Sequence, residues 1–467
     1  MKRRDFLAST LGLAAGALLP GCDDRGAASM PQAPAPVTGP DGRRRLPWQN
    51  WAGYQHCLPA ERLAPASLDE LVDVLRRAPG PVRPVGAGHS FSPLVPAEGT
   101  IVSLRNFEGL LAHDDVAMTA TFGAGARLGD IGEPLAAAGQ ALYNMPDIDE
   151  QSLAGAMATA THGTGQKLGA LHSYLTALTL VTPRGAVIEC SRRRNAEVFH
   201  AARVSLGSLG VVTRVTLRNL PTHVLKRRVW LEPAEQLLEQ FDALAAKHHS
   251  FEMYLLPSCS QAVAIAIDPT SEPVRPRGAE QDNDAVMDMK RARDLTAWWP
   301  GLRRWVLDRA TREFEPEEAV DVWHRIFPSS RAVRFNEMEY HLPREQLLPA
   351  VRQVRGVVER HPEIFFPIEV RVVKGDDAWL SPFYGHDTSG SIAVHHYHLE
   401  DPRPYFADVE AVLRPLGGRP HWGKMNTLKA ADFAALYPRW NDFQRVRREL
   451  DPDGRMLNPY LKEAFGA

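Results

Sequence analysis

Two stretches rich in glycine and other small residues constrain the fold of this 467-residue chain most. Residues 86–93 read GAGHSFSP and follow the short β-type run PVRPV. Glycine lets the backbone approach a ligand closely or adopt a positive φ, and successive N–H groups in such a turn can bind an anion. The stretch is neither a GxxxxGK[ST] loop nor a GxGxxG motif that opens a long helix, because Pro93 follows too soon. Taken alone, it fits a structural turn as well as a ligand cradle.

The second stretch, residues 147–165, reads DIDEQSLAGAMATATHGTG. Its small residues from Ala154 to Gly165 would let the backbone lie flat against a large ligand, and a tightly packed helix followed by a turn is the alternative. Two such stretches in one region, each with a histidine beside glycine or serine, favour a ligand-binding domain.

Hydrophobic periodicity predicts a mixed α+β chain. Ser67 and Glu70 fit a capping box for a helix over 67–78, and Pro79-Gly80 ends it. Further along, strands alternate with a few helices, an order that suits an antiparallel sheet with helices on one side. The predicted strands cover 100–105, 117–125, 251–257, 262–267, 332–343, 365–375 and 391–400, and the other helices 127–139 and 234–248. The polar, proline-containing segment 268–285 is predicted to be a mobile excursion.

Charge and cysteine content exclude several functions. A net charge of −2 argues against general nucleic-acid binding, which needs a basic face. Cys57, Cys190 and Cys259 show no metal-ligand spacing and are expected to be small buried hydrophobes, although one disulfide stays open. The run HHYH at 395–398 has no carboxylate to complete a ligand set, so no metal site is predicted.

The first residues have the pattern of an export signal. Lys2, Arg3 and Arg4 precede an apolar stretch, Phe6 to Pro20, that is shorter than the roughly 20 residues needed to span a bilayer. The arginine pair resembles a twin-arginine signal, and LPGC resembles a bacterial lipoprotein processing site that lipidates Cys22. The alternative is that Cys22 is simply one of four scattered cysteines. We therefore expect a signal over 1–22, a flexible tether over 23–43, and a periplasmic or cell-surface protein that meets the membrane only through a lipid anchor.

The glycine-rich stretches together resemble a known domain. PVRPVGAGHSFSP and AGAMATATHGTG are similar to the FAD-binding domain of the vanillyl-alcohol oxidase superfamily, and SLGSLGVVTRVTL (205–217) resembles its adenine side. RPHWGK (419–424) and the segment 437–461 resemble the aldonolactone oxidase family, which includes L-gulonolactone, D-arabinono-1,4-lactone and alditol oxidases. The resemblance implies a PCMH-type FAD-binding domain over 44–222, an antiparallel-sheet substrate (cap) domain over 223–418, and a segment 419–467 that returns to the FAD domain.

The resemblance also implies which residues hold the cofactor. His89 is expected to bond covalently to the flavin 8α-methyl carbon, since a neutral imidazole nitrogen is a nucleophile. A non-covalent FAD with His89 in the pocket wall is the alternative. The expected FAD-binding residues are Val85, Gly86, Ala87, Gly88, His89, Ser90, Phe91, Ser152, Gly155, Thr159, Thr161, His162, Gly163, Val211 and His421, with Val212 beside Val211.

On the substrate side, Glu369 and Arg371 share one face of a predicted strand, because residues i and i+2 do. Alone, they could be an exposed salt bridge of little consequence. The resemblance implies instead that Glu369, Arg371 and Lys424 are catalytic and bind substrate, together with Ser152 and Tyr397. Alditol oxidases offer a threonine where this chain has Tyr397 or a neighbouring histidine, a departure that bears on the substrate.

The implied function is oxidation of a sugar-derived lactone, with hydride transfer to flavin N5 and reoxidation by O₂ or another electron acceptor. An alditol or oligosaccharide oxidase is the alternative within the same fold. A non-catalytic, flavin-binding electron-relay lipoprotein is the alternative of another class, and the intact Glu369, Arg371 and Lys424 argue against it.

Overall fold

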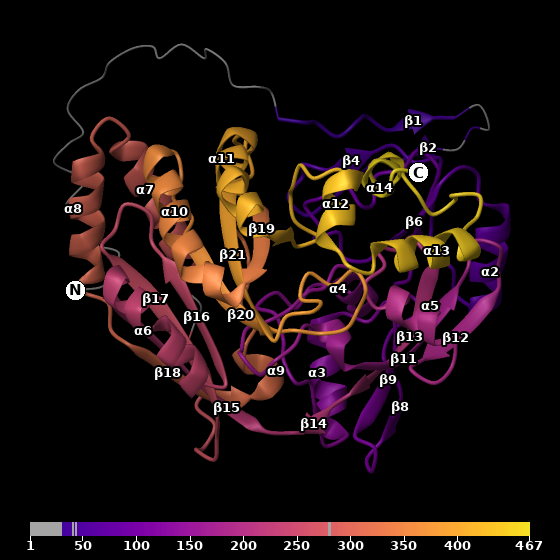
Figure 1. Cartoon of the computed structure of the whole chain (residues 1–467), viewed down its shortest axis with the longest axis horizontal. Coiled ribbons are helices and arrows are strands. Elements are labelled where there is room, and N and C mark those ends of the chain that lie inside the picture. The colour runs from indigo at the N-terminus through magenta and orange to yellow at the C-terminus, as the bar shows by residue number, and fades with distance from the viewer. Residues whose placement is uncertain (1–29, 40–41, 43, 279–281) are drawn as a thin grey trace.

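The structure is a computed structural model that describes residues 30–39, 42, 44–278 and 282–467. The predicted signal and Cys22 lie outside the described residues, as does part of the tether. The chain forms two lobes joined side by side (Figure 1). Within the described ranges, no helix combines the length and the apolar character needed to cross a bilayer.

The first lobe contains the glycine-rich stretches and two sheets. A parallel sheet has the strand order β5 (Glu61–Leu63), β7 (Thr100–Ser103), β6 (Val82–Val85). An antiparallel sheet has the order β12 (Val187–Ser191), β11 (Leu175–Val181), β13 (Val211–Arg218), β9 (Thr119–Gly123), β8 (Leu110–Asp114). The helices of this lobe are α2 (Leu68–Arg77), α3 (Leu128–Ala137), α4 (Leu153–Ala158) and α5 (Ala196–Ala202), with the 3-10 turn η1 (Leu171–Tyr174). Short pairs complete it: β1 (Val37–Thr38) with β2 (Arg44–Arg45), β3 (Trp48–Gln49) with β4 (His56–Cys57), and β10 (Gln140–Ala141) with β14 (Leu220–Pro221).

Helix α2 begins as the sequence predicts. The Ser67 hydroxyl accepts a hydrogen bond from the Glu70 N–H at 3.2 Å. The Glu70 carboxylate accepts a hydrogen bond from the N–H of Ala66. In a regular capping box the N–H of the N-cap residue itself is the donor, and here the donor lies one residue earlier. Both bonds satisfy N–H groups that a helix start otherwise leaves unpaired.

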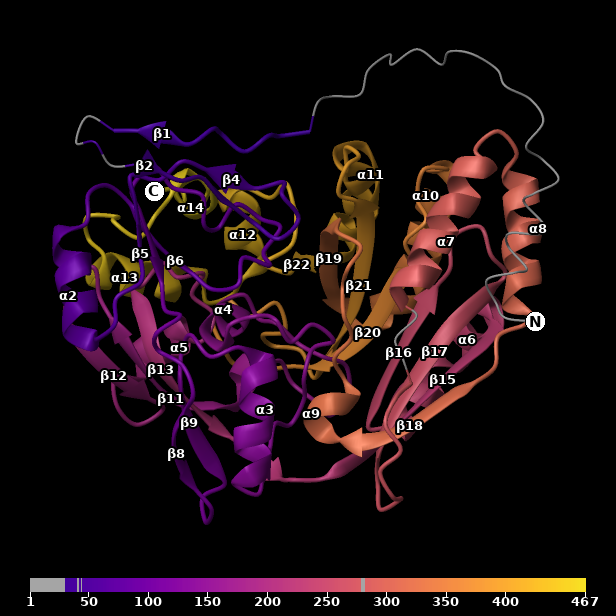
Figure 2. The same ribbon diagram turned by 180° about the vertical axis from the view of Figure 1, so that it is seen from behind.

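The second lobe is built on an eight-stranded antiparallel sheet. Its order is β18 (Glu317–Val322), β15 (Val224–Pro233), β17 (Gln261–Thr270), β16 (Ser250–Leu255), β20 (Ile368–Lys374), β21 (Thr388–Tyr397), β19 (Phe335–Pro343), β22 (Arg419–Pro420). Three helices cover one face: α6 (Ala234–Lys247), α10 (Leu347–Arg360) and α11 (Arg403–Leu413) (Figures 1 and 2). Shorter elements are α9 (Trp323–Ile326), η2 (Arg344–Gln346) and η3 (Arg414–Leu416). The predicted antiparallel sheet and the α+β class are therefore confirmed.

A helical hairpin on the other side of this sheet departs from the sequence expectation. It consists of α7 (Asp282–Leu295) and α8 (Pro300–Thr311). The segment 268–285, predicted as a loop throughout, starts as the end of β17 and finishes as the first turn of α7. The loop prediction was wrong at both ends because it followed composition: acidic and amide residues there favour a loop locally, whereas the helix is stabilised by packing.

The last residues connect the lobes. Strand β22 pairs with β19 at the edge of the large sheet, and α12 (Ala430–Leu436), α13 (Trp440–Leu450) and α14 (Pro459–Phe465) follow it. The buried guanidinium of Arg83 donates to the carbonyls of Leu94, Leu206, Gly207 and Met456 at 2.5–2.9 Å. One side chain thus ties β6, the 206–207 turn and the C-terminal segment together. Burial lowers the pKa of Arg83 to about 9, which still leaves it charged near neutral pH.

The three cysteines in the described ranges are free thiols. Cys190 and Cys259 are buried, as expected of small hydrophobes, and Cys57 is partly buried. The disulfide that the sequence left open does not form among these three.

Candidate active site

The described residues enclose two adjoining cavities near the boundary between the lobes. The first, of about 310 Å³, lies against the glycine-rich stretches. The second, of about 320 Å³, lies against the large sheet. Gln151, Thr161, His421 and Lys424 line both. A group bound in the first cavity can therefore meet a molecule bound in the second.

The first cavity has two walls that touch each other. One is the turn after β6, residues 86–90, and the other is α4 with Ser152 before it. A Cβ added at Gly86 would lie 1.9 Å from the Ser152 Oγ, so only glycine allows this approach. The turn is fixed at both ends, because the Gly88 carbonyl accepts from the Trp51 N–H at 2.8 Å and the Phe91 N–H donates to the Gly423 carbonyl at 2.6 Å.

Consecutive backbone N–H groups along this turn have no protein acceptor in the described part of the chain. They belong to Ala87, Gly88, His89 and Ser90, all of which line the cavity. Gly88 has φ +75°, which bends the backbone so that neighbouring N–H groups can converge. Unsatisfied donors beside a cavity are the chemistry that binds a phosphate or pyrophosphate. The residues therefore fit the pyrophosphate of a dinucleotide such as FAD.

His89 lies in the same wall with a neutral ring. Burial, reinforced by the positive charges of Lys424 and Arg127, lowers its pKa to about 4. Its imidazole stacks on Trp51 at 5.4 Å between ring centroids and 22° between planes. Neither ring nitrogen has a hydrogen-bond partner among the residues that the structure describes. His89 therefore presents an uncharged nitrogen lone pair beside the cofactor cavity.

Most of the residues predicted to bind FAD line this cavity. They are Val85, Gly86, Ala87, Gly88, His89, Ser90, Ser152, Gly155, Thr159, Thr161 and His421. Phe91 does not; its ring packs against Trp51 and Phe335. Val211 does not either, because strand alternation points it into the core, and Val212 takes the cavity position. His162 and Gly163 line the second cavity instead.

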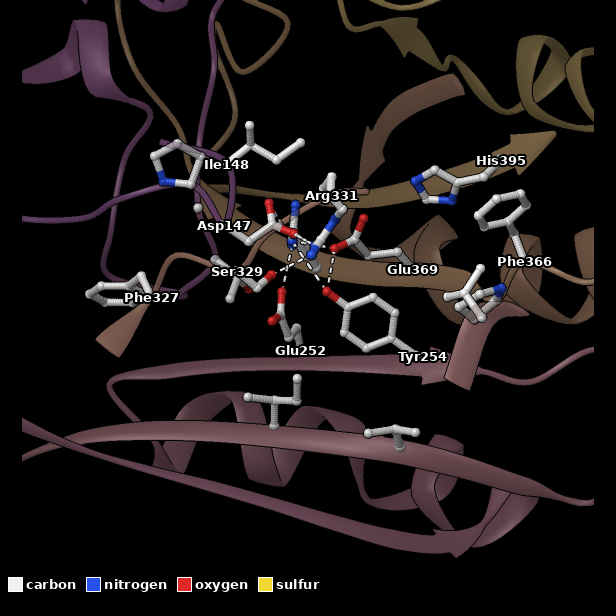
Figure 3. A pocket seen from close by; sticks show the side chains of 18 of the residues that line it. Asp147, Ile148, Glu252, Tyr254, Phe327, Ser329, Arg331, Phe366, Glu369 and His395 are labelled. Carbon is white, nitrogen blue, oxygen red and sulfur yellow. Dashed lines mark hydrogen bonds and ion pairs between the residues drawn. The ribbon is translucent and has the colours of Figure 1, made fainter. Parts of the chain in front are cut away.

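Arg371 is the centre of a charged cluster in the second cavity. Figure 3 labels the other members of this cluster, which are Asp147, Glu252, Tyr254, Arg331 and Glu369. The Arg371 guanidinium contacts Glu252 at 2.6 Å, Asp147 at 3.4 Å and, in a short contact, Glu369. The Tyr254 hydroxyl donates to Glu369 at 2.7 Å. Arg331 binds Asp147 from the other side. Burial and the nearby carboxylates raise the pKa of Tyr254 well above its usual value, so its hydroxyl stays protonated.

Glu369 differs from an ordinary ion-paired carboxylate. Burial raises its pKa to about 8, aided by the charges of Asp147 and Glu252 and only partly opposed by Arg371. Arg371 does not offset the burial fully, because its single guanidinium is divided among Glu369, Glu252 and Asp147. Glu369 can thus exchange a proton near neutral pH.

Lys424 lies where the two cavities meet. Its ammonium binds Glu337 in a short ion pair and sits 5.1 Å from the centroid of the Phe91 ring. Burial alone would lower its pKa, but Glu337 and Glu339 raise it above the usual value. A positive charge is therefore held permanently beside both cavities.

A second buried polar group surrounds His162. Its Nε2 lies 2.9 Å from Glu339 and its Nδ1 2.7 Å from the Gly163 carbonyl. Burial lowers the pKa of His341 to about 3, and that of His421 well below its usual value. The ligand atoms of His162, Glu339 and His341 lie within 4.8 Å of one another, as do those of Glu337, Glu369 and His395. Glu337 of the second set is ion-paired with Lys424, and in the first set Glu339 and His162 bind each other.

Part of the wall of the second cavity is apolar. Val263, Ile265 and Ile267 project from one face of β17, and Val286 and Met289 of α7 also line the space. The cavity therefore combines the charged cluster around Arg371 and Lys424 with an apolar patch on β17 and α7, and Arg227, Arg277 and Glu317 complete this lining.

The residues predicted to be catalytic, Glu369, Arg371 and Lys424, all line the second cavity. Two predicted substrate contacts do not. Ser152 lines the first cavity, against the turn at Gly86. Tyr397, the last residue of β21, packs on Phe365 beyond the cavity, and His395 on the same strand face lines it instead.

Sequence reasoning missed several charged residues of this site. Glu252 and Tyr254 alternate on β16, and Glu337 and Glu339 alternate on β19. Charged or hydroxyl side chains at every second position of an otherwise apolar strand are the same signal that revealed Glu369 and Arg371, and could have found them. Asp147 and Arg331 lie in loops, where no such periodicity exists.

Comparison with known proteins places the chain among flavin-linked oxidoreductases. The family model described as D-arabinono-1,4-lactone oxidase matches residues 215–464, and that of an FAD-binding domain matches residues 59–191. The L-gulono-1,4-lactone dehydrogenase of Mycobacterium tuberculosis is 35% identical over 431 residues, 90% of this chain and 99% of the relative. The L-gulonolactone oxidase of Bos taurus is 31% identical over 91% of this chain and 99% of its own length. The crystal structure of cholesterol oxidase from Brevibacterium sterolicum superposes with a TM-score of 0.74 at 17% identity, covering 92% of this chain and 99% of that one, which shows the fold.

Proposed function

This chain belongs to the D-arabinono-1,4-lactone oxidase family, and from that premise we propose that it oxidises a CH–OH group of a sugar-derived lactone. It is an FAD-dependent oxidoreductase of the CH–OH type, and the lactone of D-arabinono-1,4 or L-gulono-1,4 type is the substrate we infer. The observation that carries the proposal is the charged cluster in the second cavity, where Glu369, Arg371 and Lys424 adjoin the cofactor cavity.

FAD, when bound, supplies the hydride acceptor and later passes the electrons to O₂ or another acceptor. The free N–H groups of residues 87–90 would hold its pyrophosphate, and the small residues of α4 would form the opposite wall. Lys424 would offset negative charge that accumulates on the reduced cofactor, since a fixed buried cation needs no reorganisation to do so.

We propose that His89 bonds covalently to the flavin. Its low pKa and its unpaired ring nitrogens support the assignment, since the neutral imidazole is the nucleophilic form. The test is acid precipitation of the purified protein. Yellow colour that stays in the pellet supports the bond, and colour that moves entirely to the supernatant contradicts it.

Glu369 is the residue that we propose takes the hydroxyl proton of the substrate. Its raised pKa suits a base that works near neutral pH, and the buried Arg371 and Tyr254 hold it in place. Arg371 would also bind a substrate oxygen, as an always-charged donor with several N–H groups. Hydride loss and proton loss would then occur on one carbon and its oxygen.

The experiment that tests the function is anaerobic reduction of the bound flavin by a panel of compounds. The panel contains aldonolactones and alditols, and lactones with and without an apolar substituent, because β17 and α7 line part of the cavity with apolar side chains. Bleaching by lactones supports the proposal, and bleaching by alditols alone supports an alditol oxidase. A yellow protein that no member bleaches supports the non-catalytic electron relay.

Reoxidation of the reduced flavin, in a second step of the same experiment, identifies the electron acceptor. Two similar proteins carry the names dehydrogenase and oxidase, so the family name leaves O₂ and other acceptors open for this chain. Rapid return of the oxidised spectrum on admission of air indicates an oxidase. Slow return with air but fast return with a quinone or dye indicates a dehydrogenase.

We also propose that the chain is exported by its twin-arginine-like signal and lipidated at Cys22, on the sequence pattern alone. Metabolic labelling with a radioactive fatty acid tests the anchor: the label should be present in the natural chain and absent from Cys22→Ser. Replacement of Arg3 and Arg4 by lysine should block export, and unimpaired export would contradict the twin-arginine assignment.

A further inference from the structure

The tip of the α7–α8 hairpin exposes a group of large apolar side chains. Trp298 is 76% exposed, Trp305 59%, Trp299 54% and Leu295 52%. Among the described residues, these three tryptophans are the only aromatic side chains in the set of exposed large hydrophobics. We call these four residues the tryptophan tip. An apolar group of this kind on a soluble surface marks an interaction site more often than a single exposed leucine does.

The tip is braced from below, so its exposure is built into the fold. Buried Arg293 donates to the Glu363 carbonyl at 2.8 Å and forms ion pairs with Glu400. Buried Arg303 donates to the Pro362 carbonyl at 2.6 Å. Two arginines thus hold both helices on the lobe beneath, and the three indole rings stay more than half exposed.

The composition of the tip favours a lipid surface. The segment 295–307 reads LTAWWPGLRRWVL, contains two arginines and no carboxylate, and lies between Asp294 and Asp308. Arg303 is buried, and the Arg304 side chain is 58% exposed with its guanidinium 3.8 Å from Glu359. Tryptophan prefers the headgroup level of a bilayer, and a nearby cation attracts anionic lipid.

The position of the tryptophan tip agrees with docking on a lipid surface. The hairpin tip and the described segment that leads into β1 lie along the same edge of the molecule (Figures 1 and 2). That segment begins at Met30, and the eight residues back to Cys22 span at most about 28 Å when extended. A lipid on Cys22 can therefore reach a membrane on the side that the tip faces.

We propose that the tryptophan tip is a membrane-docking site, in which the indole rings of Trp298, Trp299 and Trp305 enter the headgroup region of an anionic lipid surface. The tip would act beside the N-terminal lipid, because buried indole rings add their own attachment to the same membrane surface. It is independent of the oxidoreductase function, since none of the four residues lines either cavity.

The experiment uses the full-length flavoprotein with Cys22→Ser, so that a covalent lipid cannot carry the binding. Its cosedimentation is measured with vesicles of phosphatidylethanolamine and phosphatidylglycerol (3:1) and with vesicles of phosphatidylcholine alone. The test variant adds Trp298→Ser, Trp299→Ser and Trp305→Ser. The matched control adds Val116→Ser and Val187→Ser instead, which remove exposed apolar groups from the first lobe.

We expect the parent and the control to bind the anionic vesicles and the triple variant to bind at least tenfold more weakly. Flavin content and turnover of a soluble substrate should be the same in all three proteins, which shows that the triple variant is folded. Binding that is absent in the parent, or equal in the triple variant, would overturn the proposal. So would a parent that ignores vesicles but dimerises in sedimentation velocity, with a monomeric triple variant, because the tip would then be a self-association surface.

Discussion

The raised pKa of Glu369 predicts a specific pH dependence. With a pKa of about 8, roughly a tenth of this carboxyl is ionised at pH 7 and roughly nine tenths at pH 9. If the ionised form takes the substrate proton, kcat/KM should rise about tenfold between these pH values and level off above them. The measurement is steady-state or anaerobic flavin reduction at subsaturating substrate, because kcat/KM reports groups of the free enzyme.

Two variants separate this reasoning from a general effect of pH. Glu369→Gln should lower kcat/KM by about 10²–10⁴ and abolish the rising limb, as loss of a general base does. Glu252→Gln removes a neighbouring negative charge that raises the pKa of Glu369, and it leaves Arg371 with one partner fewer. In this variant the rise of kcat/KM should therefore occur at lower pH, and the enzyme should stay active. The assignment would be refuted if kcat/KM of Glu252→Gln rose at the same pH as before, or if the rise persisted in Glu369→Gln.

Four further outcomes follow from single contacts. His89→Ala should bind FAD more weakly and release all colour in acid, and retention of acid-stable flavin would place the bond elsewhere. Gly86→Ala should lower FAD affinity at least tenfold because of the Ser152 Oγ at 1.9 Å, and Ser152→Gly should restore much of it, as measured by flavin titration. Lys424→Met should reduce the rate of flavin reduction about 10²-fold or more in a stopped-flow trace. Arg83→Met should lower the free energy of unfolding by about 3–5 kcal/mol in urea, because four buried carbonyls lose their donor.

Local sequence signals predicted those elements whose stability is local. Helix α2 has its cap and its apolar stripe within a dozen residues, and the turn at 86–90 has its glycines in place. The paired side chains of β20 follow from strand alternation alone. These features depend on residues close together in the chain, so the sequence reveals them directly.

The remaining parts of the fold and of the site depend on contacts between residues that are far apart in the sequence. Helix α7 begins in a polar segment, and the contacts of Arg293 and Arg303 with residues 362–363 and 400 fix both α7 and α8. Asp147 becomes part of the site only because Arg371, more than 200 positions later, packs against it. Tyr397 lies outside the substrate cavity because β21 ends at this residue, and strand alternation alone does not reveal where a strand ends. No pattern within a single segment carries such information.

The charge arrangement around Arg371 explains why the carboxyl group with the raised pKa is Glu369 and not Asp147. Both carboxylates share the Arg371 guanidinium, which Glu252 also contacts. Asp147 has a second cation, Arg331, and its pKa is held well below the usual range even though burial alone would raise it. The other partner of Glu369 is the Tyr254 hydroxyl, which donates a hydrogen bond but carries no charge. A neutral hydrogen bond stabilises a buried carboxylate less than a salt bridge does, so the ionised form of Glu369 is less compensated than that of Asp147. It is also the strand neighbour of Arg371 in the cavity that adjoins the cofactor site, which places the exchangeable proton where the oxidation requires it.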